Sequence, residues 1–183
     1  MRKLSALIIC SALLFACNND PKTEITDSKT ASASTGTGPK DYEFTDSKYC
    51  DIAKAGLQNL VTGDIDTWMA SFADNAVYRW NNLDSLIGKA AITDYWKKRR
   101  ADVIDSMSVT SDIWLPIKVN KPMAPGHLTG NYALTWDVVY AKYKTGKSMK
   151  QRIHTIFHFD ENDKIDRVLQ YLDHAPIAAA NTK

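Results

Sequence analysis

The sequence predicts an α+β domain in which helices cover one face of a bent antiparallel sheet. Two observations support this fold class. Segments with helical periodicity come first in the chain, and long segments of alternating apolar and polar residues follow them. Runs of helices before runs of strands are typical of α+β domains. Roughly 130 residues lie beyond a polar N-terminal part, which is enough for one domain with its own core.

Two helices are expected at the start of the domain. Residues 47–62 carry apolar side chains at helical spacing, with Asp46 or Ser47 as the N-cap and Gly63 as the C-terminal stop. A second helix begins at Asp64, whose carboxylate can cap it. The apolar stripe of this second helix consists of Ile65, Trp68, Met69 and Phe72.

A third helix is expected over residues 88–103. Its inward-facing residues are Ile92, Tyr95, Trp96 and Val103. The basic cluster Lys97–Arg100 lies late in this helix, where cations suit the helix dipole, and we expect its side chains to face water. The formal net charge of the chain is only +2 and no other basic stretch is present. Nucleic acid is therefore not an expected partner.

Strands are expected in four places. Asp74-Asn75 ends the second helix, and residues 76–81 form a short strand. Apolar residues occupy six of the seven odd positions of residues 107–119, and residues 130–143 form the next strand after a loop. The last segment, residues 151–176, alternates on both sides of a polar turn and predicts two paired strands. The turn before it is assigned to four residues, Lys144–Lys147.

The N-terminal end is predicted to be the signal peptide of a bacterial lipoprotein, residues 1–17. Basic residues 2–3 precede an apolar run, residues 4–15, which is too short to span a bilayer. Residues 14–17, Leu-Phe-Ala-Cys, resemble a lipobox, in which the cysteine is lipidated. We therefore expect a membrane anchor at Cys17 and a location on the periplasmic or surface side of the cell envelope. An ordinary signal peptide is the alternative.

The rest of the chain divides into a tether, a domain and a tail. Residues 18–45 are rich in Ser, Thr, Gly and Pro and carry few large apolar side chains. Such a segment buries too little surface to offset its ordering entropy, so a flexible tether is expected. The domain is assigned to residues 46–176 and a C-terminal tail to residues 177–183. Cys50 is the one cysteine of this domain, and we expect a buried thiol.

Four short motifs resemble the nuclear transport factor 2-like superfamily, which includes SnoaL-like polyketide cyclases and ketosteroid isomerases. The motifs are Gly63-Asp64-Ile65-Asp66, Phe72-Ala73-Asp74-Asn75-Ala76-Val77, Gly88-Lys89-Ala90-Ala91-Ile92 and Phe159-Asp160-Glu161-Asn162-Asp163-Lys164-Ile165. The resemblance implies a cone-shaped, curved antiparallel β-sheet packed against three N-terminal helices. Because this fold supports many unrelated functions, it does not determine an activity.

Ketosteroid isomerases use a carboxylate base together with a tyrosine and a protonated carboxylic acid. The resemblance aligns these three positions with Trp80, Gly56 and Thr155 of this chain. None of them carries the required group, so ketosteroid isomerisation is not expected. No cysteine and histidine spacing indicates a metal site, and no cofactor is expected.

The same resemblance predicts which side chains face the inside of the cone. It places Ile153, Thr155, Phe157, Val168, Gln170 and Leu172 on the concave wall, and simple hairpin pairing adds Leu134, Trp136, Val138 and Tyr140. A small apolar or aromatic ligand suits such a wall. The predicted ligand-binding residues are Phe72, Trp80, Trp136, Tyr140, Thr155, Phe157, Gln170 and Leu172. Alternatively, these side chains simply fill the cone.

The opposite face carries the candidate catalytic residues Asp137, His154 and Asp173. In the simplest hairpin register Asp137 lies directly across from His154, and a carboxylate that orients a histidine can support general-base catalysis. A cross-strand ion pair on an outer face is the alternative. An error of one residue in the register would turn this face into the pocket.

Three functions fit these features. The first is an envelope-anchored domain that binds a small molecule in its cone. The second is a SnoaL-like enzyme performing an acid–base isomerisation, cyclisation or hydrolysis, which requires a carboxylate or histidine inside the cone; Asp137, His154, Asp173 and His174 are the possible donors. The third is an interaction module that forms a homodimer through the outer face of the sheet.

Overall fold

The computed structural model describes residues 38–122 and 124–182. The predicted signal peptide, Cys17 and most of the predicted tether lie outside the described residues. The strands are β1 (Tyr42–Phe44), β2 (Phe72–Trp80), β3 (Ser85–Ile87), β4 (Ile104–Val119), β5 (Gly130–Tyr143), β6 (Ser148–Phe159) and β7 (Ile165–Tyr171). The helices are α1 (Lys48–Thr62), α2 (Ile65–Met69), α3 (Lys89–Asp102) and α4 (His174–Asn181).

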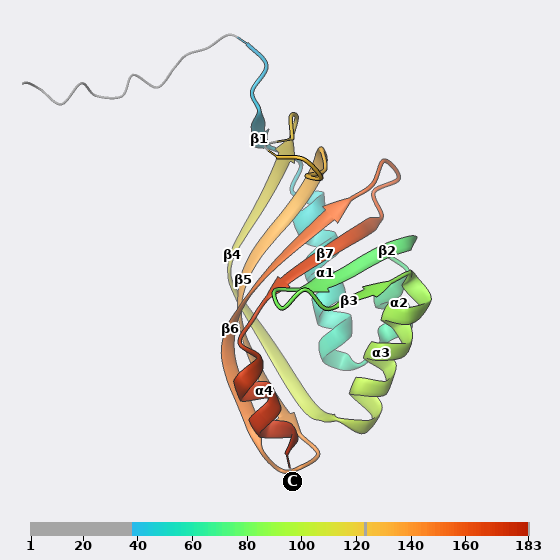
Figure 1. The fold of residues 1–183 in the computed structure, drawn as a ribbon, viewed down its shortest axis with the longest axis vertical. Coiled ribbons are helices and arrows are strands. Elements are labelled where there is room, and N and C mark those ends of the chain that lie inside the picture. The colour runs from blue at the N-terminus through green and yellow to red at the C-terminus, as the bar shows by residue number, and fades with distance from the viewer. Residues whose placement is uncertain (1–37, 123, 183) are drawn as a thin grey trace, which may run out of the picture. The chain divides into compact units, whose positions relative to one another are not determined.

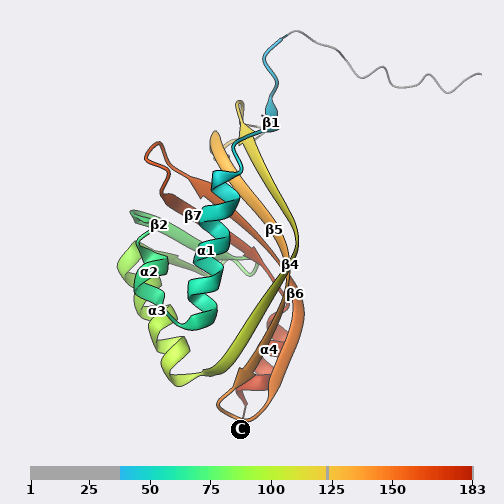
Figure 2. The same cartoon turned by 180° about the vertical axis from the view of Figure 1, so that it is seen from behind.

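The described strands form one sheet with the order β1-β4-β5-β6-β7-β2-β3. The long strands β4, β5 and β6 curve strongly, and α1, α2 and α3 lie together on the concave side (Figure 1). The same arrangement is seen from behind, where α1 runs along the sheet (Figure 2). The predicted fold class and its three N-terminal helices are confirmed. One pairing differs, because β2 and β7 run parallel and the sheet is mixed.

Local signals set the ends of the first two helices. Gly63 ends α1 with a φ of 87°, and its N–H donates to the carbonyls of Asn59 and Leu60. The left-handed conformation of this residue explains the glycine. The carboxylate of Asp64 accepts a hydrogen bond of 3.1 Å from the N–H of Thr67, which caps α2 as predicted.

The second helix is shorter and the following strand longer than predicted. The strand β2 already begins at Phe72 and runs through Asp74-Asn75, which were expected to end the second helix. The register between β2 and β7 shifts between Phe72 and Val77. These two polar residues therefore lie in an irregular part of a strand, a place where breaker residues are tolerated.

Two segments outside the predicted domain limits are ordered. Residues 42–44, predicted as tether, form β1 and pair with the edge of β4. Three residues are too few to display a period of two, which explains why the sequence did not indicate this strand. Residues 174–181, predicted as the end of a strand and a tail, form α4, in which Ala180 is buried and Ile177 packs against the same cluster.

The main core lies between the sheet and the first three helices. Aromatic side chains dominate it, and Trp68 packs edge-on against Phe72 and Trp96 with ring centroids 5.4 and 5.6 Å apart. Such contacts add stability beyond the burial of apolar surface. Cys50 is 3% exposed, so the predicted buried thiol is confirmed. A smaller cluster follows along β5 and β6 toward α4; its buried members are Ile104, Val139, Ala141, Tyr143, Met149, Ile153 and Ala180.

The hairpin between β5 and β6 corrects the predicted faces of β5. Lys142 pairs with Ser148, and the loop between the strands contains Gly146 with a φ of 86°. The backbone of Tyr143 still pairs with that of Lys147, so the connection has one residue fewer than the four-residue turn that was predicted. Because side chains alternate along a strand, this single residue moves every side chain of β5 to the other face.

The predicted pairing of Asp137 with His154 is therefore wrong. Asp137 pairs with Ile153, and His154 pairs with Trp136. The concave face of β5 carries Thr135, Asp137, Val139 and Ala141, whereas Leu134, Trp136, Val138 and Tyr140 belong to the opposite face.

Candidate functional site

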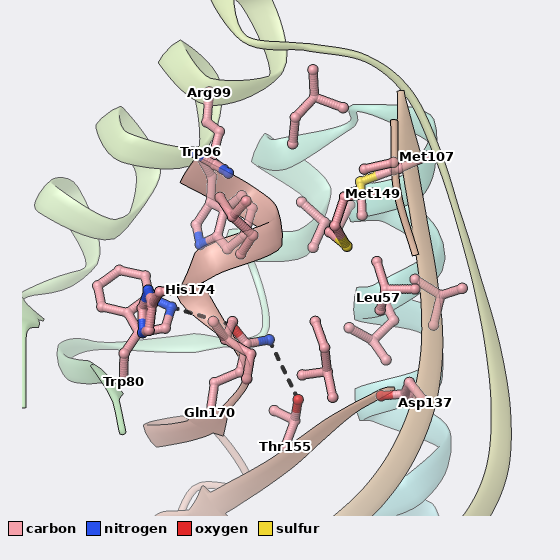
Figure 3. Close-up of a pocket in the computed structure, with 18 of the residues that line it drawn as sticks. Leu57, Trp80, Trp96, Arg99, Met107, Asp137, Met149, Thr155, Gln170 and His174 are labelled. Carbon is pink, nitrogen blue, oxygen red and sulfur yellow. Dashed lines mark hydrogen bonds between the residues drawn. The ribbon is translucent and has the colours of Figure 1, made fainter. Parts of the chain in front are cut away.

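A cavity of about 320 Å³ opens on the concave side, between the sheet, α1, α3 and α4. This volume is within the range of small-molecule sites. Most of its wall is apolar or aromatic, and Leu57, Met107 and Met149 lie along one side (Figure 3). Its polar lining residues are Asp84, Arg99, Asp137, Thr155, Gln170 and His174.

Asp137 is the buried carboxylate of this cavity. Its residue is only 2% exposed, and it lies on the concave face of β5. The hydroxyl of Ser111 donates to its Oδ1 at 2.5 Å, and the hydroxyl of Thr135 donates to the same atom at 2.8 Å. A carboxylate so removed from water requires such donors.

The position of each donor follows from the sheet. Ser111 on β4 pairs directly with Asp137. Thr135 lies two residues before Asp137 on β5, which places both side chains on one face. The β4–β5 register shifts between Ser111 and Ile113, so a β-bulge lies beside the carboxylate. Bulges of this kind often redirect a side chain next to a functional site.

A short chain of polar side chains crosses the cavity wall beside Asp137. The indole N–H of Trp80 donates to Oε1 of Gln170 at 3.2 Å, and the amide of Gln170 donates to the hydroxyl of Thr155 at 3.4 Å (Figure 3). Gln170 and Thr155 are direct partners in the pairing of β6 with β7. Three elements of the sheet thus supply polar groups to one end of an otherwise apolar cavity.

The positions that serve ketosteroid isomerases are used structurally here. A Cβ atom at Gly56 would lie 2.6 Å from Cδ1 of Trp68, so the indole of Trp68 occupies the space that a tyrosine would need. Trp80 and Thr155 belong to the polar chain described above. The cavity therefore contains a carboxylate at a different place on the sheet, at Asp137.

Arg99 also lines the cavity, although the basic cluster of α3 was expected to face water. The guanidinium carbon lies 6.0 Å from the ring centroid of Tyr143. Burial raises the pKa of Tyr143, and the positive charge of Arg99 opposes that rise. The spacing of Arg99 from Ile92 and Trp96 follows the apolar stripe of the helix. This periodicity could have identified Arg99 as an inward-facing residue.

The structure separates the predicted ligand-binding residues into three groups. Trp80, Thr155, Gln170 and Leu172 line the cavity. Phe72 and Phe157 lie in the main core, each no more than 2% exposed, and do not reach the cavity. Trp136 and Tyr140 lie on the opposite face because of the corrected register.

The candidate catalytic residues are likewise divided. Asp137 and His174 line the cavity. His154 lies on the outer face, where its ring stacks on Trp136 with centroids 4.3 Å apart and its Nδ1 contacts the carbonyl of Thr135 at 2.8 Å. Asp173 is exposed and caps α4 by accepting a hydrogen bond from the N–H of Ala175.

The described residues contain neither a candidate metal site nor a candidate membrane-spanning helix. Within residues 38–122 and 124–182, no three His, Cys, Asp or Glu side chains are grouped so that they could hold a metal ion. In the same ranges, no helix has both the length and the apolar character needed to cross a membrane.

Comparison with known proteins identifies the domain. The family model described as the SnoaL-like domain matches residues 53–168. A search of curated proteins found no match.

Solved structures with the same fold are diverse. An LEH-like epoxide hydrolase from M. tuberculosis has a TM-score of 0.56 at 16% identity, covering 74% of this chain and 90% of its own. A protein of unknown function from Burkholderia pseudomallei has a TM-score of 0.60 at 11% identity, covering 75% and 100%. SalBIII, an epoxide hydrolase/cyclase-like enzyme of salinomycin pyran ring formation, has a TM-score of 0.54 at 14% identity, covering 70% and 93%. Likeness at these identities shows the fold alone.

Proposed function

Because the chain belongs to the SnoaL-like domain family, we propose that it is an enzyme that binds a small, mostly apolar molecule in its cone and performs acid–base chemistry on it. The carboxylate of Asp137 is the proton acceptor. The observation that carries this proposal is the position of that carboxylate, buried on the cavity wall and held by two hydroxyl donors. The reaction class is an isomerisation, a cyclisation or a hydrolysis that begins with removal of a proton.

The surroundings of Asp137 suit this role. An apolar cavity excludes bulk water, so a charge inside it is poorly screened and acts strongly on a bound molecule. The donors from Ser111 and Thr135 hold the carboxylate in one orientation, which a general base requires. The Thr155 hydroxyl and the Gln170 amide can hold a polar atom of the ligand at the same end of the cavity.

The fold neighbours support the choice of reaction classes without determining one. One is an epoxide hydrolase and another is an epoxide hydrolase/cyclase-like enzyme. A domain that only binds its ligand is the second candidate, and the predominantly apolar wall favours it. The two candidates differ in whether the buried carboxylate accelerates proton removal.

A model substrate can test the base before the natural substrate is known. The probe is 5-nitrobenzisoxazole, a small flat aromatic molecule whose ring opens when a base removes the proton on C3. The proton goes to the carboxylate, the N–O bond breaks and a coloured cyanophenolate forms. We expect the wild type to accelerate this reaction over free acetate, and Asp137→Asn to lose about 100-fold or more of the acceleration.

The matched control is Asp84→Asn, since Asp84 is an exposed carboxylate that also borders the cavity. Its carboxylate accepts a hydrogen bond from Asn82, so its role there is local. The control should retain the rate, and thermal melting should show that both variants are folded. Equal rates for the wild type and Asp137→Asn would reject the proposal of an enzyme and favour a domain that only binds its ligand.

We also propose that the domain is held at the bacterial cell envelope through a lipid on Cys17. The N-terminal sequence pattern supports this, with basic residues, a short apolar run and a small residue before the cysteine. Cells expressing the full chain with radiolabelled palmitate should label the protein and carry it in the membrane fraction. Cys17→Ser should abolish the label, and equal labelling of both would refute the anchor.

A further inference from the structure

We propose that the ligand of the cone is an organic carboxylic acid whose carboxylate binds to Arg99 while its apolar body extends along the cavity toward Asp137. This inference rests on the proposed function only in taking the cone as the small-molecule site. It adds the chemical class of the ligand and the orientation in which it binds.

The first observation concerns the partners of the basic cluster in α3. Lys97 pairs with Asp66 at 2.7 Å, and Lys98 pairs with Asp102 at 2.9 Å. Arg100 donates from Nη2 to the carbonyl of Val61 at 3.1 Å. Three of the four cations are thus engaged by the protein itself.

Arg99 differs from its three neighbours. Among the residues that the structure describes, no carboxylate pairs with it, and its guanidinium lies beside the ring of Tyr143. It is half-buried and lines the cavity rather than the outer surface. A guanidinium on an apolar wall presents several N–H donors in a planar fork, and that geometry matches the two oxygens of a carboxylate.

The second observation is the arrangement of charge along the cavity. Arg99 lies at one end in Figure 3, while Asp137 and Thr155 lie at the other, with Met107, Met149 and Leu57 along the wall between them. A molecule in this space meets a cation first, then an apolar stretch, then a proton acceptor. That sequence of environments matches an amphipathic acid, which would keep its own negative charge away from Asp137.

Electrostatics favour a carboxylate at the Arg99 end over the other possibilities. Arg99 lies in the last turn of α3, whose carbonyl ends carry roughly half a negative charge. The full positive charge of the guanidinium exceeds this opposing dipole. A phosphate group would bring up to two charges to a single arginine, and the cost of removing the second charge from water would be uncompensated. A singly charged carboxylate is the anion that one arginine can neutralise.

The test compares ligands that share a body and differ in charge. The probes are 4-phenylbutanoate and its neutral amide, 4-phenylbutanamide, and binding is followed by calorimetry and by tryptophan fluorescence, because Trp80 and Trp96 line the cavity. For the wild type we expect the carboxylate to bind at least about tenfold more tightly than the amide, since hydrogen bonds to charged groups are the stronger ones.

The variants assign that preference to one side chain. Arg99→Gln should remove the preference, so that the carboxylate binds no more tightly than the amide. Arg99→Lys should keep part of it, because an ammonium retains the charge but loses the planar fork. The matched control is Lys98→Gln, the neighbouring cation that pairs with Asp102 outside the cavity, and it should bind both probes as the wild type does.

The outcomes separate this inference from the proposed function. Equal binding of carboxylate and amide by the wild type, or a preference that survives Arg99→Gln, would overturn the role of Arg99 and leave the cone as a binding site. Failure of both probes to bind would also overturn the inference. The enzyme proposal would still be judged by the separate effect of Asp137→Asn on 5-nitrobenzisoxazole.

Discussion

The two faces of β5 and β6 carry similar residue types but place them in very different surroundings. On the concave face, Thr135, Asp137 and Thr155 are each no more than 2% exposed. The hydroxyl of Thr135 donates a hydrogen bond to the carboxylate of Asp137. On the convex face, Trp136 and His154 form a stack with Tyr171, which is 50% exposed. The histidine would be the better base by residue type alone. Its ring lies outside the cone, so the location of a group matters more here than its chemistry.

The largest expected difference between the faces is in how much the free energy of unfolding depends on a single apolar side chain. Phe157 is 1% exposed in the main core, while its neighbour Ile156 is half-buried beside an outer groove. Phe157→Ala should lower the free energy of unfolding by about 3–5 kcal/mol because it leaves a cavity among rigid neighbours. Ile156→Ala, the matched control, should cost about 1–2 kcal/mol, since part of that side chain stays in water. Urea unfolding measures both, and equal losses would contradict the assignment of the faces.

A second comparison concerns polar groups on β4. Ser111→Ala removes one donor to the buried carboxylate of Asp137 and should cost about 1–3 kcal/mol. Thr110→Ala changes an exposed residue on the other face and should stay within about 0.5 kcal/mol. Thermal or urea unfolding distinguishes the two. A Ser111→Ala variant as stable as the wild type would show that the carboxylate does not depend on this donor.

The convex side contains a titrating group of its own, His158. Its Nδ1 contacts the carboxylate of Asp166 and its Nε2 lies 2.9 Å from the carbonyl of Thr129, so both ring nitrogens face acceptors. Burial lowers the pKa of His158, but the contacts with Asp166 and Thr129 together raise it above the ordinary 6.5. The imidazolium form suits this position.

Folding raises the pKa of this histidine, so its protonated form stabilises the folded protein. The stabilisation is complete at pH values below the pKa of the residue in the unfolded chain, and it is lost as the pH rises through the pKa in the folded protein. The free energy of unfolding should therefore decrease as the pH is raised from about 6 to above the pKa of His158 in the folded protein. Asp166→Asn should flatten this part of the profile. A wild-type profile that rises over the same range would refute the assignment.

The smallest expected effect on stability is at the exposed end of the aromatic stack. Tyr171→Asp should change the free energy of unfolding by about 1 kcal/mol or less, the value of one aromatic contact. Its effect on assembly should be larger, because we expect a homodimer through the convex face and a new charge there would be buried. Light scattering of wild type and variant tests this. A wild-type protein that is monomeric at high concentration would contradict the expected dimer.

The elements with strong local signals could be predicted from the sequence. The helix α1 and its glycine stop, the cap of α2 at Asp64 and the three long strands were all expected close to their observed limits. These features depend on residues near one another in the chain. The short strands β1 and β3 have too few residues for a period to be visible, and they form because β4 and β2 are available to pair with them. The helix α4 is rich in alanine and shows little contrast between an apolar and a polar face, so the sequence did not indicate it.

The candidate site was predictable only in part. Trp80, Thr155 and Gln170 were among the predicted ligand-binding residues, and all three line the cavity. Asp137 was assigned to the outer face because the loop after β5 was taken to be one residue longer than it is. Arg99 was placed in water because its basic neighbours suggested an exposed helix face, although its spacing from Trp96 belongs to the buried stripe.

The sequence by itself determined the fold class, because helical and strand periodicities are local properties that no distant contact needs to supply. It also contained every side chain of the candidate site. Only the tertiary structure decided which of these side chains face the cavity. One residue more in the β5–β6 loop would exchange the concave and convex side chains of β5. The pairing of Asp137 with Ile153 is set by the whole hairpin. That register places the carboxylate of Asp137 inside the cone and the ring of His154 outside it.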